Sequence, residues 1–172
     1  MNKRFAAVLI LISLCLAWGL PCQAEEKATP QEVYDLILKA VPVMEELGPD
    51  GLAAFNDPKG EFVYKDTYVV VVDCEKMVMA AHPNPKFVGV SLKGFMDKNP
   101  DPSKRKDFNQ DMCDVGKRPN GGWAEFYWTK LGDETPYRKI NFSLRVPGFP
   151  YTLNAGIYDD TVSVDELNAS LK

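Results

Sequence analysis

One lysine, one histidine and a set of aromatic residues are the side chains of this sequence best placed to do chemistry. Lys139 lies in the segment PYRKINFSLR, in which polar and apolar residues alternate. An extended strand with this pattern has Lys139 on one face together with Asn141, Ser143 and Arg145. If that face borders a pocket walled by aromatic rings, the ammonium attracts a carboxylate, and a low local dielectric strengthens the attraction. The alternative is a solvated lysine on the open face of a sheet.

Four further side chains are candidates for contact with a ligand. Trp123 follows two glycines, which let the backbone bend and a ligand approach closely, and its indole is a wide wall with one donor. Trp123 is equally well explained as a core residue. Tyr68 and Tyr158 are strand aromatics whose hydroxyls could point inward. Arg118 could hold a carboxylate through two hydrogen bonds, or it could be solvated.

His82 is the only histidine in the chain. Catalysis would need a partner base or nucleophile and a metal site would need further ligands, and neither stands at a suitable spacing. We expect His82 to fix the HPNP turn through a hydrogen bond, with donation to a bound ligand as the alternative. The sequence also contains no glycine-rich phosphate loop and no GxSxG or HExxH pattern. It therefore predicts a protein that is not an enzyme and that has no cofactor and no metal.

The first 24 residues have the pattern of a secretory signal peptide. Lys3 and Arg4 precede an apolar run that ends at Leu20, and Ala24 is a small residue of the kind that signal peptidase prefers. We therefore expect cleavage after residue 24, a periplasmic or secreted location, and a single domain over residues 25–172. A retained membrane anchor is the alternative.

Cys74 and Cys113 are the cysteines that remain after such a cleavage. In an exported protein, two cysteines most simply form one disulfide bond. The bond would close a loop of about 40 residues, for which the chain-entropy account gives about 4 kcal/mol of stabilisation. The alternative is a small redox protein or an enzyme that uses Cys113 or His82.

The charge of the chain argues against nucleic acid as a partner. The formal net charge is −4 at pH 7, and loss of the basic signal peptide makes it more negative. An acidic surface attracts neither nucleic acid nor anionic membranes. The segment 98–111 mixes basic with acidic residues, which indicates a solvated helix face rather than a basic patch.

The order of the predicted elements is that of an α+β protein. Thr29 and Glu32 form a capping box before an apolar stripe of helical period, so we expect a long helix that begins at Pro30 and is kinked or interrupted at Pro42. The predicted strands are 68–72, 77–81, 123–130, 137–146 and 151–158, and the further helical segments are 51–55, 103–115 and 165–172. Helices followed by a five-stranded meander indicate the α+β class.

Five short motifs follow one another along these elements. They are Tyr68 before an apolar run and an acidic turn, Ala81-His82-Pro83, Gly121-Gly122-Trp123, Pro136-x-x-Lys139 and Gly156-Ile157-Tyr158. Each is weak alone, but together they resemble the single Cache domain of type 2, a PAS-like extracellular sensor domain, over residues 30–160. The resemblance implies a long N-terminal helix packed on a five-stranded antiparallel sheet of PAS- or profilin-like topology. It also implies a small-molecule pocket on one face of that sheet.

One position departs from this pattern. The strand after the GGW motif often carries a tyrosine three residues past the tryptophan in such domains, and here that position is Phe126, followed by Tyr127 and Trp128. A pocket hydroxyl is therefore missing, unless Tyr127 supplies it through a β-bulge. Phe126 and Tyr127 are both retained as candidate pocket residues.

The function that the resemblance implies is that of a stand-alone, secreted Cache domain that binds a small organic anion. Lys139 and the aromatic walls suit a short carboxylate such as acetate, propionate, pyruvate or lactate. The chain carries no output segment, so the expected partner is a separate membrane receptor or transporter, and the expected state is a monomer or a weak dimer. The alternative is a structural or interaction protein on the same fold with a degenerate pocket.

Overall fold

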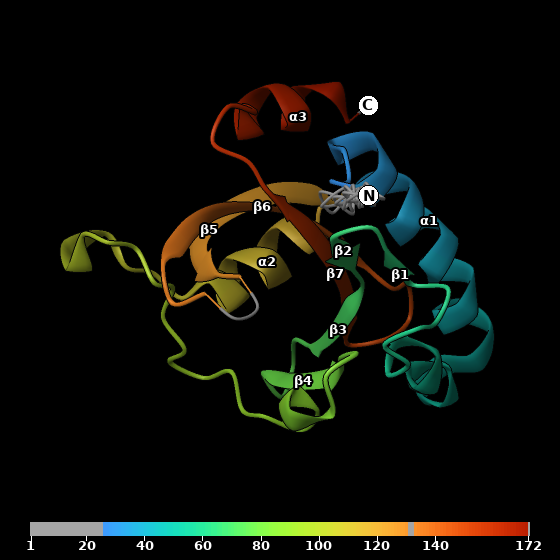
Figure 1. The fold of residues 1–172 in the computed structure, drawn as a ribbon. Helices are drawn as coiled ribbons and strands as arrows, with labels where there is room; N and C mark the ends of the chain where they lie inside the picture. Colours follow the sequence, from blue (N-terminus) through green and yellow to red (C-terminus); the bar gives the residue numbers. More distant parts are fainter. Residues whose placement is uncertain (1–25, 131–132, 172) are drawn as a thin grey trace, which may run out of the picture.

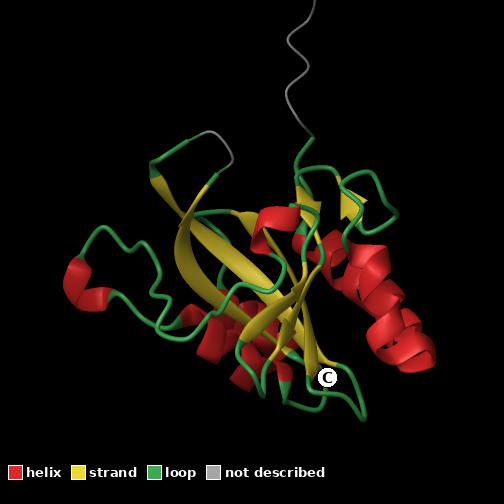
Figure 2. Ribbon diagram, turned by 90° about the horizontal axis from the view of Figure 1, so that it is seen from below, coloured by secondary structure: helices red, strands yellow, loops and turns green. Residues whose placement is uncertain are grey.

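A five-stranded antiparallel sheet lies at the centre of the molecule, with helices on both of its faces (Figures 1 and 2). The computed structural model describes residues 26–130 and 133–171, so the predicted signal peptide lies outside the described residues. Within these ranges no helix combines the length and the apolar character that a membrane crossing requires.

The long N-terminal helix α1 (Pro30–Leu47) begins as its capping box predicts. The Thr29 hydroxyl accepts a hydrogen bond from the Glu32 N–H, and the Glu32 carboxylate accepts one from the Thr29 N–H at 2.8 Å. The helix continues through Pro42, so of the two expected effects the interruption is wrong, and the kink stays a prediction. Pro42 lies on the exposed side of α1, where the carbonyl that loses its helical partner can be hydrated. A 3₁₀-helix, η1 (Gly48–Phe55), follows directly.

The strand order of the sheet is β4-β3-β7-β6-β5, and all neighbouring strands are antiparallel. The strands are β3 (Val70–Asp73), β4 (Val78–Ala81), β5 (Gly122–Thr129), β6 (Pro136–Arg145) and β7 (Tyr151–Tyr158). The α+β prediction and the five antiparallel strands are confirmed, but the simple meander is wrong, because the last strand pairs with β3. The chain between β4 and β5 crosses to the far edge of the sheet, which leaves a central place for β7 with both faces buried.

The smaller elements refine the predicted segments. The strand expected at 68–72 is divided between β3 and a separate two-stranded ribbon of β1 (Val63–Tyr64) and β2 (Thr67–Tyr68). The helical segment expected at 103–115 is divided between η3 (Pro102–Lys104) and α2 (Phe108–Gly116). Asp107 caps α2 by accepting a hydrogen bond from the Gln110 N–H. The remaining short helices are η2 (Pro85–Phe87) and α3 (Val164–Ser170).

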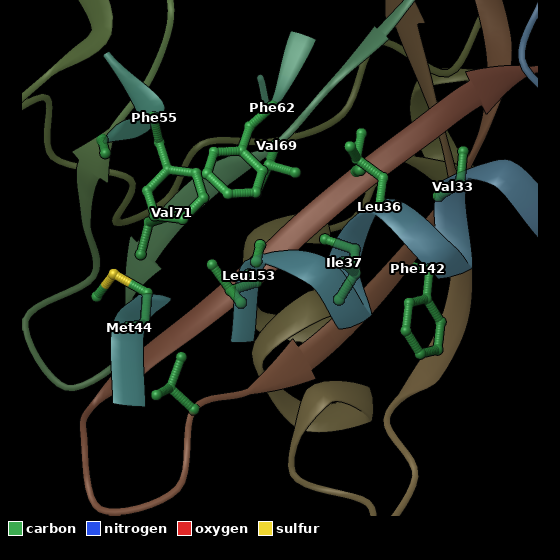
Figure 3. Close-up of a cluster of buried hydrophobic side chains, with 14 of the residues drawn as sticks. Val33, Leu36, Ile37, Met44, Phe55, Phe62, Val69, Val71, Phe142 and Leu153 are labelled. Carbon is green, nitrogen blue, oxygen red and sulfur yellow. The ribbon is translucent and has the colours of Figure 1, made fainter. Parts of the chain in front are cut away.

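The main core lies between α1 and one face of the sheet (Figure 3). Every third or fourth residue of α1 is buried against alternate residues of the strands, since the helical and strand periods meet along one face. The fully buried contributors include Val33, Ile37, Met44, Phe55, Phe62, Val69, Val71, Phe142 and Leu153. Each such side chain contributes about 1.5–3 kcal/mol through burial, so this face is the stable half of the molecule.

The opposite face of the sheet is covered by α2, which contacts β5, β6 and β7. At the end of α2, a Cβ on Gly116 would lie only 2.7 Å from Cγ2 of Thr152, so glycine permits the close approach of helix and sheet. The Cys74–Cys113 disulfide ties α2 to the end of β3, as the sequence predicts. A small apolar cluster of Val72, Leu92 and Cys113 surrounds the bond.

Removal of the disulfide is expected to destabilise the domain by about 4 kcal/mol, because the bond restricts a loop of about 40 residues in the unfolded chain. The measurement is urea unfolding of the Cys74→Ala/Cys113→Ala variant beside the wild type. Wild type in excess reductant should unfold at the same lower urea midpoint as the variant. An unchanged midpoint in reductant would contradict the prediction.

Candidate functional site

A cavity of about 330 Å³ lies on the face of the sheet opposite to α1. Its floor is formed by β3, β5, β6 and β7, one wall by β4 and the chain that follows it, and another wall by α2. The residues that border it are Tyr68, Val70, Met79, His82, Lys86, Phe87, Val90, Leu92, Phe95, Phe108, Asn109, Met112, Phe126, Trp128, Lys139, Asn141, Asn154, Ala155 and Gly156.

The lining of this cavity is mostly apolar and its only charged groups are basic. Aromatic rings dominate the walls, and Phe108 on α2 stacks on Phe126 of β5 with ring centroids 4.3 Å apart. Lys139 and Lys86 border the cavity, and no aspartate or glutamate does so among the described residues. Lys86 is exposed, whereas Lys139 is only partly accessible. Such a lining favours an anion with an apolar body.

Lys139 projects from β6 between two tyrosine rings. Its Nζ lies 5.6 Å from the centre of the Tyr68 ring and 5.2 Å from that of Tyr158, distances at which a cation is attracted to the ring face. Within residues 26–130 and 133–171 no carboxylate lies within ion-pair distance of this ammonium. Burial lowers the pKa of Lys139 to about 8, against a smaller opposing effect of the Asp66 charge. With this pKa the lysine is still mostly charged at pH 7 and loses its proton as the pH rises past about 8.

The two tyrosines beside Lys139 have different hydrogen-bonding roles. The Tyr158 hydroxyl donates to the carbonyl of Thr129 at 2.8 Å, so it holds the end of β5. For Tyr68, burial raises the pKa of the hydroxyl and no hydrogen bond contributes to the shift. Tyr68, which borders the cavity, thus remains protonated, and in the described part of the chain its O–H donates to no other group.

His82 is a neutral donor at the same end of the cavity. Its Nδ1 accepts a hydrogen bond from the Asn84 N–H at 2.8 Å, which confirms the predicted role in the HPNP turn and assigns the proton of the neutral ring to Nε2. Burial and, to a smaller degree, the Lys139 charge lower the pKa of His82 to about 4. The imidazole lies beside Tyr68, with ring centroids 5.2 Å apart.

Two asparagines complete the floor of the cavity. The Asn141 Nδ2 donates to the Ser143 hydroxyl at 3.0 Å, and that hydroxyl donates to the Asn154 Oδ1 at 2.8 Å. Asn141 and Ser143 lie on the same strand face as Lys139, as the alternation predicts, whereas Asn154 is contributed by β7. This buried chain of polar groups extends along the floor away from Lys139.

Four of the eight predicted site residues border the cavity: Tyr68, His82, Phe126 and Lys139. Their role in ligand binding stays a prediction. Trp123 lies on the other face of the sheet, 3% exposed, in the main core, with its ring 5.1 Å from that of Phe142. Trp123 is therefore a core residue, which is the alternative to ligand contact that the sequence analysis gave.

The other three predicted residues are not part of the cavity lining. Tyr158 flanks Lys139 from outside. Tyr127 points to the opposite face, because β5 pairs with β6 in unbroken register and the β-bulge that would have turned it inward does not occur. Arg118 is exposed and borders a different, open groove of about 590 Å³ between α2 and α3, which has charges of both signs. These three residues were predicted as site residues from short sequence motifs. Their actual surroundings depend on the register of the strands and on the packing of the helices.

The residues that the sequence analysis missed come mainly from three segments: the chain that follows β4, helix α2 and strand β7. Helix α2 folds back over the sheet and thereby brings Phe108, Asn109 and Met112 to the cavity. No local sequence pattern predicts this contact. Trp128 could have been found, since it stands two residues from Phe126 on the same strand face.

The fold and the cavity together define a class of domain in which one face of an antiparallel sheet packs against a long helix and the other face holds a cavity of small-molecule size. The family model of the single Cache domain 2 matches residues 27–169. The chain belongs to this family. A search of curated proteins finds no match.

Three solved structures share the fold. One, described as the periplasmic sensor domain of a chemotaxis protein, has 23% identity and a TM-score of 0.62, and the match covers 76% of this chain and 94% of that one. A second, from work on carboxylic acid recognition by a Cache chemosensory domain, has 19% identity, a TM-score of 0.59 and coverages of 76% and 92%. A third is a methyl-accepting chemotaxis protein from Vibrio parahaemolyticus RIMD 2210633, with 19% identity, a TM-score of 0.61 and coverages of 77% and 90%.

Lys139→Met is expected to stabilise the ligand-free protein at pH 7 by about 2 kcal/mol, because burial disfavours the charged lysine. This figure lies below that of the full pKa shift, since solvent that reaches the cavity screens the charge. The folded-state pKa lies below the unfolded one, so the unfolded chain holds more protons between about pH 8 and 10.5. The lysine therefore becomes less destabilising as pH rises through that window, and the gain from Lys139→Met shrinks.

The measurement is urea unfolding of Lys139→Met and wild type at pH 7 and pH 10. Lys130→Met is the matched control, because Lys130 also lies over the Tyr158 ring, at 5.3 Å, but does not border the cavity. This control should bring no gain in stability. A loss of stability in Lys139→Met at pH 7 would show that the lysine serves the fold instead.

Proposed function

We propose that this Cache domain binds a small organic anion of the carboxylate class in the cavity over β6, and that it does so in the periplasm. The observation that carries the proposal is Lys139, a cation in a mostly apolar cavity without a carboxylate partner among the described residues. Burial of an unpaired charge is costly. A ligand carboxylate compensates that cost and restores the pKa of the lysine toward its ordinary value.

Three donors lie together at the Lys139 end of the cavity. They are the ammonium of Lys139, the free hydroxyl of Tyr68 and the Nε2–H of neutral His82. A carboxylate has two oxygens that accept up to four hydrogen bonds, so it can satisfy all three donors. These three donors carry a single positive charge, which suits one carboxylate, and Lys86, the second cation that borders the cavity, is exposed.

The similarity of the fold to a domain studied for carboxylic acid recognition agrees with this proposal. At 19% identity the likeness concerns the fold, so the argument for this chain depends on its own donors. The aromatic walls of the cavity then select the part of the ligand beyond its carboxylate, because their apolar surface favours an apolar body.

Signalling is proposed to proceed through a separate membrane receptor or transporter, with the domain acting as a monomer or weak dimer. A ligand in the cavity contacts both the sheet and α2, so binding favours arrangements in which the two are held together. A partner protein that binds preferentially to this arrangement of α2 and the sheet receives the signal that ligand is present. The open cavity favours this function over a degenerate pocket, and the disulfide leaves no free thiol at Cys113 for redox chemistry.

Short carboxylates are expected to raise the melting temperature of the exported protein, since a ligand that binds only the native state stabilises it. The screen compares acetate, propionate, pyruvate and lactate with propionamide, the uncharged counterpart of propionate. The amide should give no shift. Lys139→Met should abolish the shift, whereas Arg118→Met, which removes a cation outside the cavity, should retain it.

The affinity of a carboxylate that binds should fall about tenfold per pH unit above about pH 8, because the free protein loses the Lys139 proton there. Isothermal titration calorimetry at pH 7, 8, 9 and 10 measures this dependence. Equal binding of acid and amide, or an affinity that is independent of pH, would refute the role of Lys139.

A further inference from the structure

Asn109 on α2 is a buried amide whose hydrogen bonds the fold does not complete. The residue is 1% exposed and borders the cavity. Across the described ranges, its Nδ2 is the one buried side-chain nitrogen or oxygen without a hydrogen-bond partner. Buried polar groups are nearly always paired in folded proteins, and an unpaired one indicates a role beyond packing.

The surroundings of Asn109 show why an apolar residue would serve the fold equally well. Phe108 and Met112, the other α2 residues that border the cavity, pack with Phe126 in an apolar cluster. Asn109 is therefore the only polar side chain that α2 contributes to the cavity lining. Helix capping does not require it either, because Asp107 caps α2.

We propose that Asn109 is a second polar anchor of the cavity and donates a hydrogen bond to an uncharged oxygen on the body of the ligand. The ligand is then a monocarboxylate that also bears a ketone, hydroxyl or ether oxygen away from its carboxylate. This inference rests on the proposed function, since Lys139 holds the carboxylate. It goes further by naming the group at the other side of the cavity.

The positions of the two anchors support this arrangement. Lys139 lies on the floor of the cavity, paired across strands with Phe126, and Asn109 lies on the facing helix, next to the Phe108 ring that stacks on Phe126. The terminal torsion of asparagine is broad, so the amide can turn toward an acceptor in the cavity. No cation on α2 borders the cavity, so this helix offers no charge to compensate a second anionic group, and an uncharged oxygen suits Asn109 better.

The size of the cavity also supports a ligand that is longer than acetate and reaches Asn109. A volume of about 330 Å³ is within the range of small-molecule sites, and a two-carbon acid such as acetate fills only a small part of it. A longer body brings an oxygen within reach of α2 while its carbons contact the aromatic walls.

The test compares two matched pairs of acids, 4-oxopentanoate with pentanoate and 5-oxohexanoate with hexanoate, by calorimetry on the disulfide-bonded, exported protein. The better oxo acid should bind about tenfold more tightly than its alkanoate, the effect of one added hydrogen bond. In Asn109→Leu this preference should vanish. Gln110→Leu makes the same change at an exposed position of α2 and should retain the preference.

The melting temperature of the ligand-free variants separates a binding role from a structural one. Asn109→Leu should melt at or above the wild-type temperature, because it removes an unpaired buried amide. Equal binding of oxo acids and alkanoates by the wild type would overturn this inference and leave the proposed function standing. A lower melting temperature of Asn109→Leu with an unchanged oxo-acid preference would also overturn it. Failure of all four acids while propionate binds would likewise overturn this inference, whereas failure of these acids and of the short carboxylates alike would overturn the proposed function itself.

Discussion

The two-residue period of β6 is the constraint on which the organisation of this domain depends. Successive side chains of the strand enter two different environments, with Ile140 and Phe142 in the core beneath α1 and Lys139 and Asn141 at the cavity. The neighbouring strands keep this division because their pairing with β6 runs in unbroken register. A shift by one residue would bury Lys139 under α1 and expose the core, so register fixes fold and site together.

This division separates stability from binding. The face beneath α1 buries large apolar side chains that are fully enclosed, and it supplies much of the favourable free energy of folding. The opposite face retains groups that oppose folding, among them an ammonium without an ion-pair partner in the described structure and the unpaired amide of Asn109. A stable core on one face lets the other face hold polar groups whose partners come from outside the protein.

The wall formed by α2 depends on long-range contacts. The helix has nine residues, too few to be stable alone in water, and it is held by the Cys74–Cys113 bond, by the stacking of Phe108 on Phe126 and by the close approach at Gly116. The chain before it is fastened to β5 by the Asp97 carboxylate, which accepts hydrogen bonds from the N–H groups of Tyr127 and Lys106. These contacts hold the α2 wall of the cavity at a defined place over the sheet.

The sequence by itself determined the long N-terminal helix, the approximate positions of the five sheet strands, the family resemblance and the side of β6 that bears Lys139. These features depend on local period and on short motifs: the capping box at Thr29, the alternation around Lys139 and the two remaining cysteines are each visible in a few residues. The family match then confirmed the resemblance over almost the whole chain. Local sequence also predicted the hydrogen bond of His82 in its turn.

Only the tertiary structure decided which candidates meet in one cavity. Trp123 and Tyr127 stand on the same strand as Phe126, and because no bulge interrupts β5 in the folded sheet, the alternation of the strand places both on the opposite face. Asn109 and Asn154 reach the cavity from a helix and a strand that are distant in sequence from Lys139 on either side. The physical reason is that the two-residue period of a strand fixes which face a side chain lies on. The neighbours that it meets on that face depend on the strand order and on the packing of α2. Both of these arise from contacts between segments that are distant in sequence.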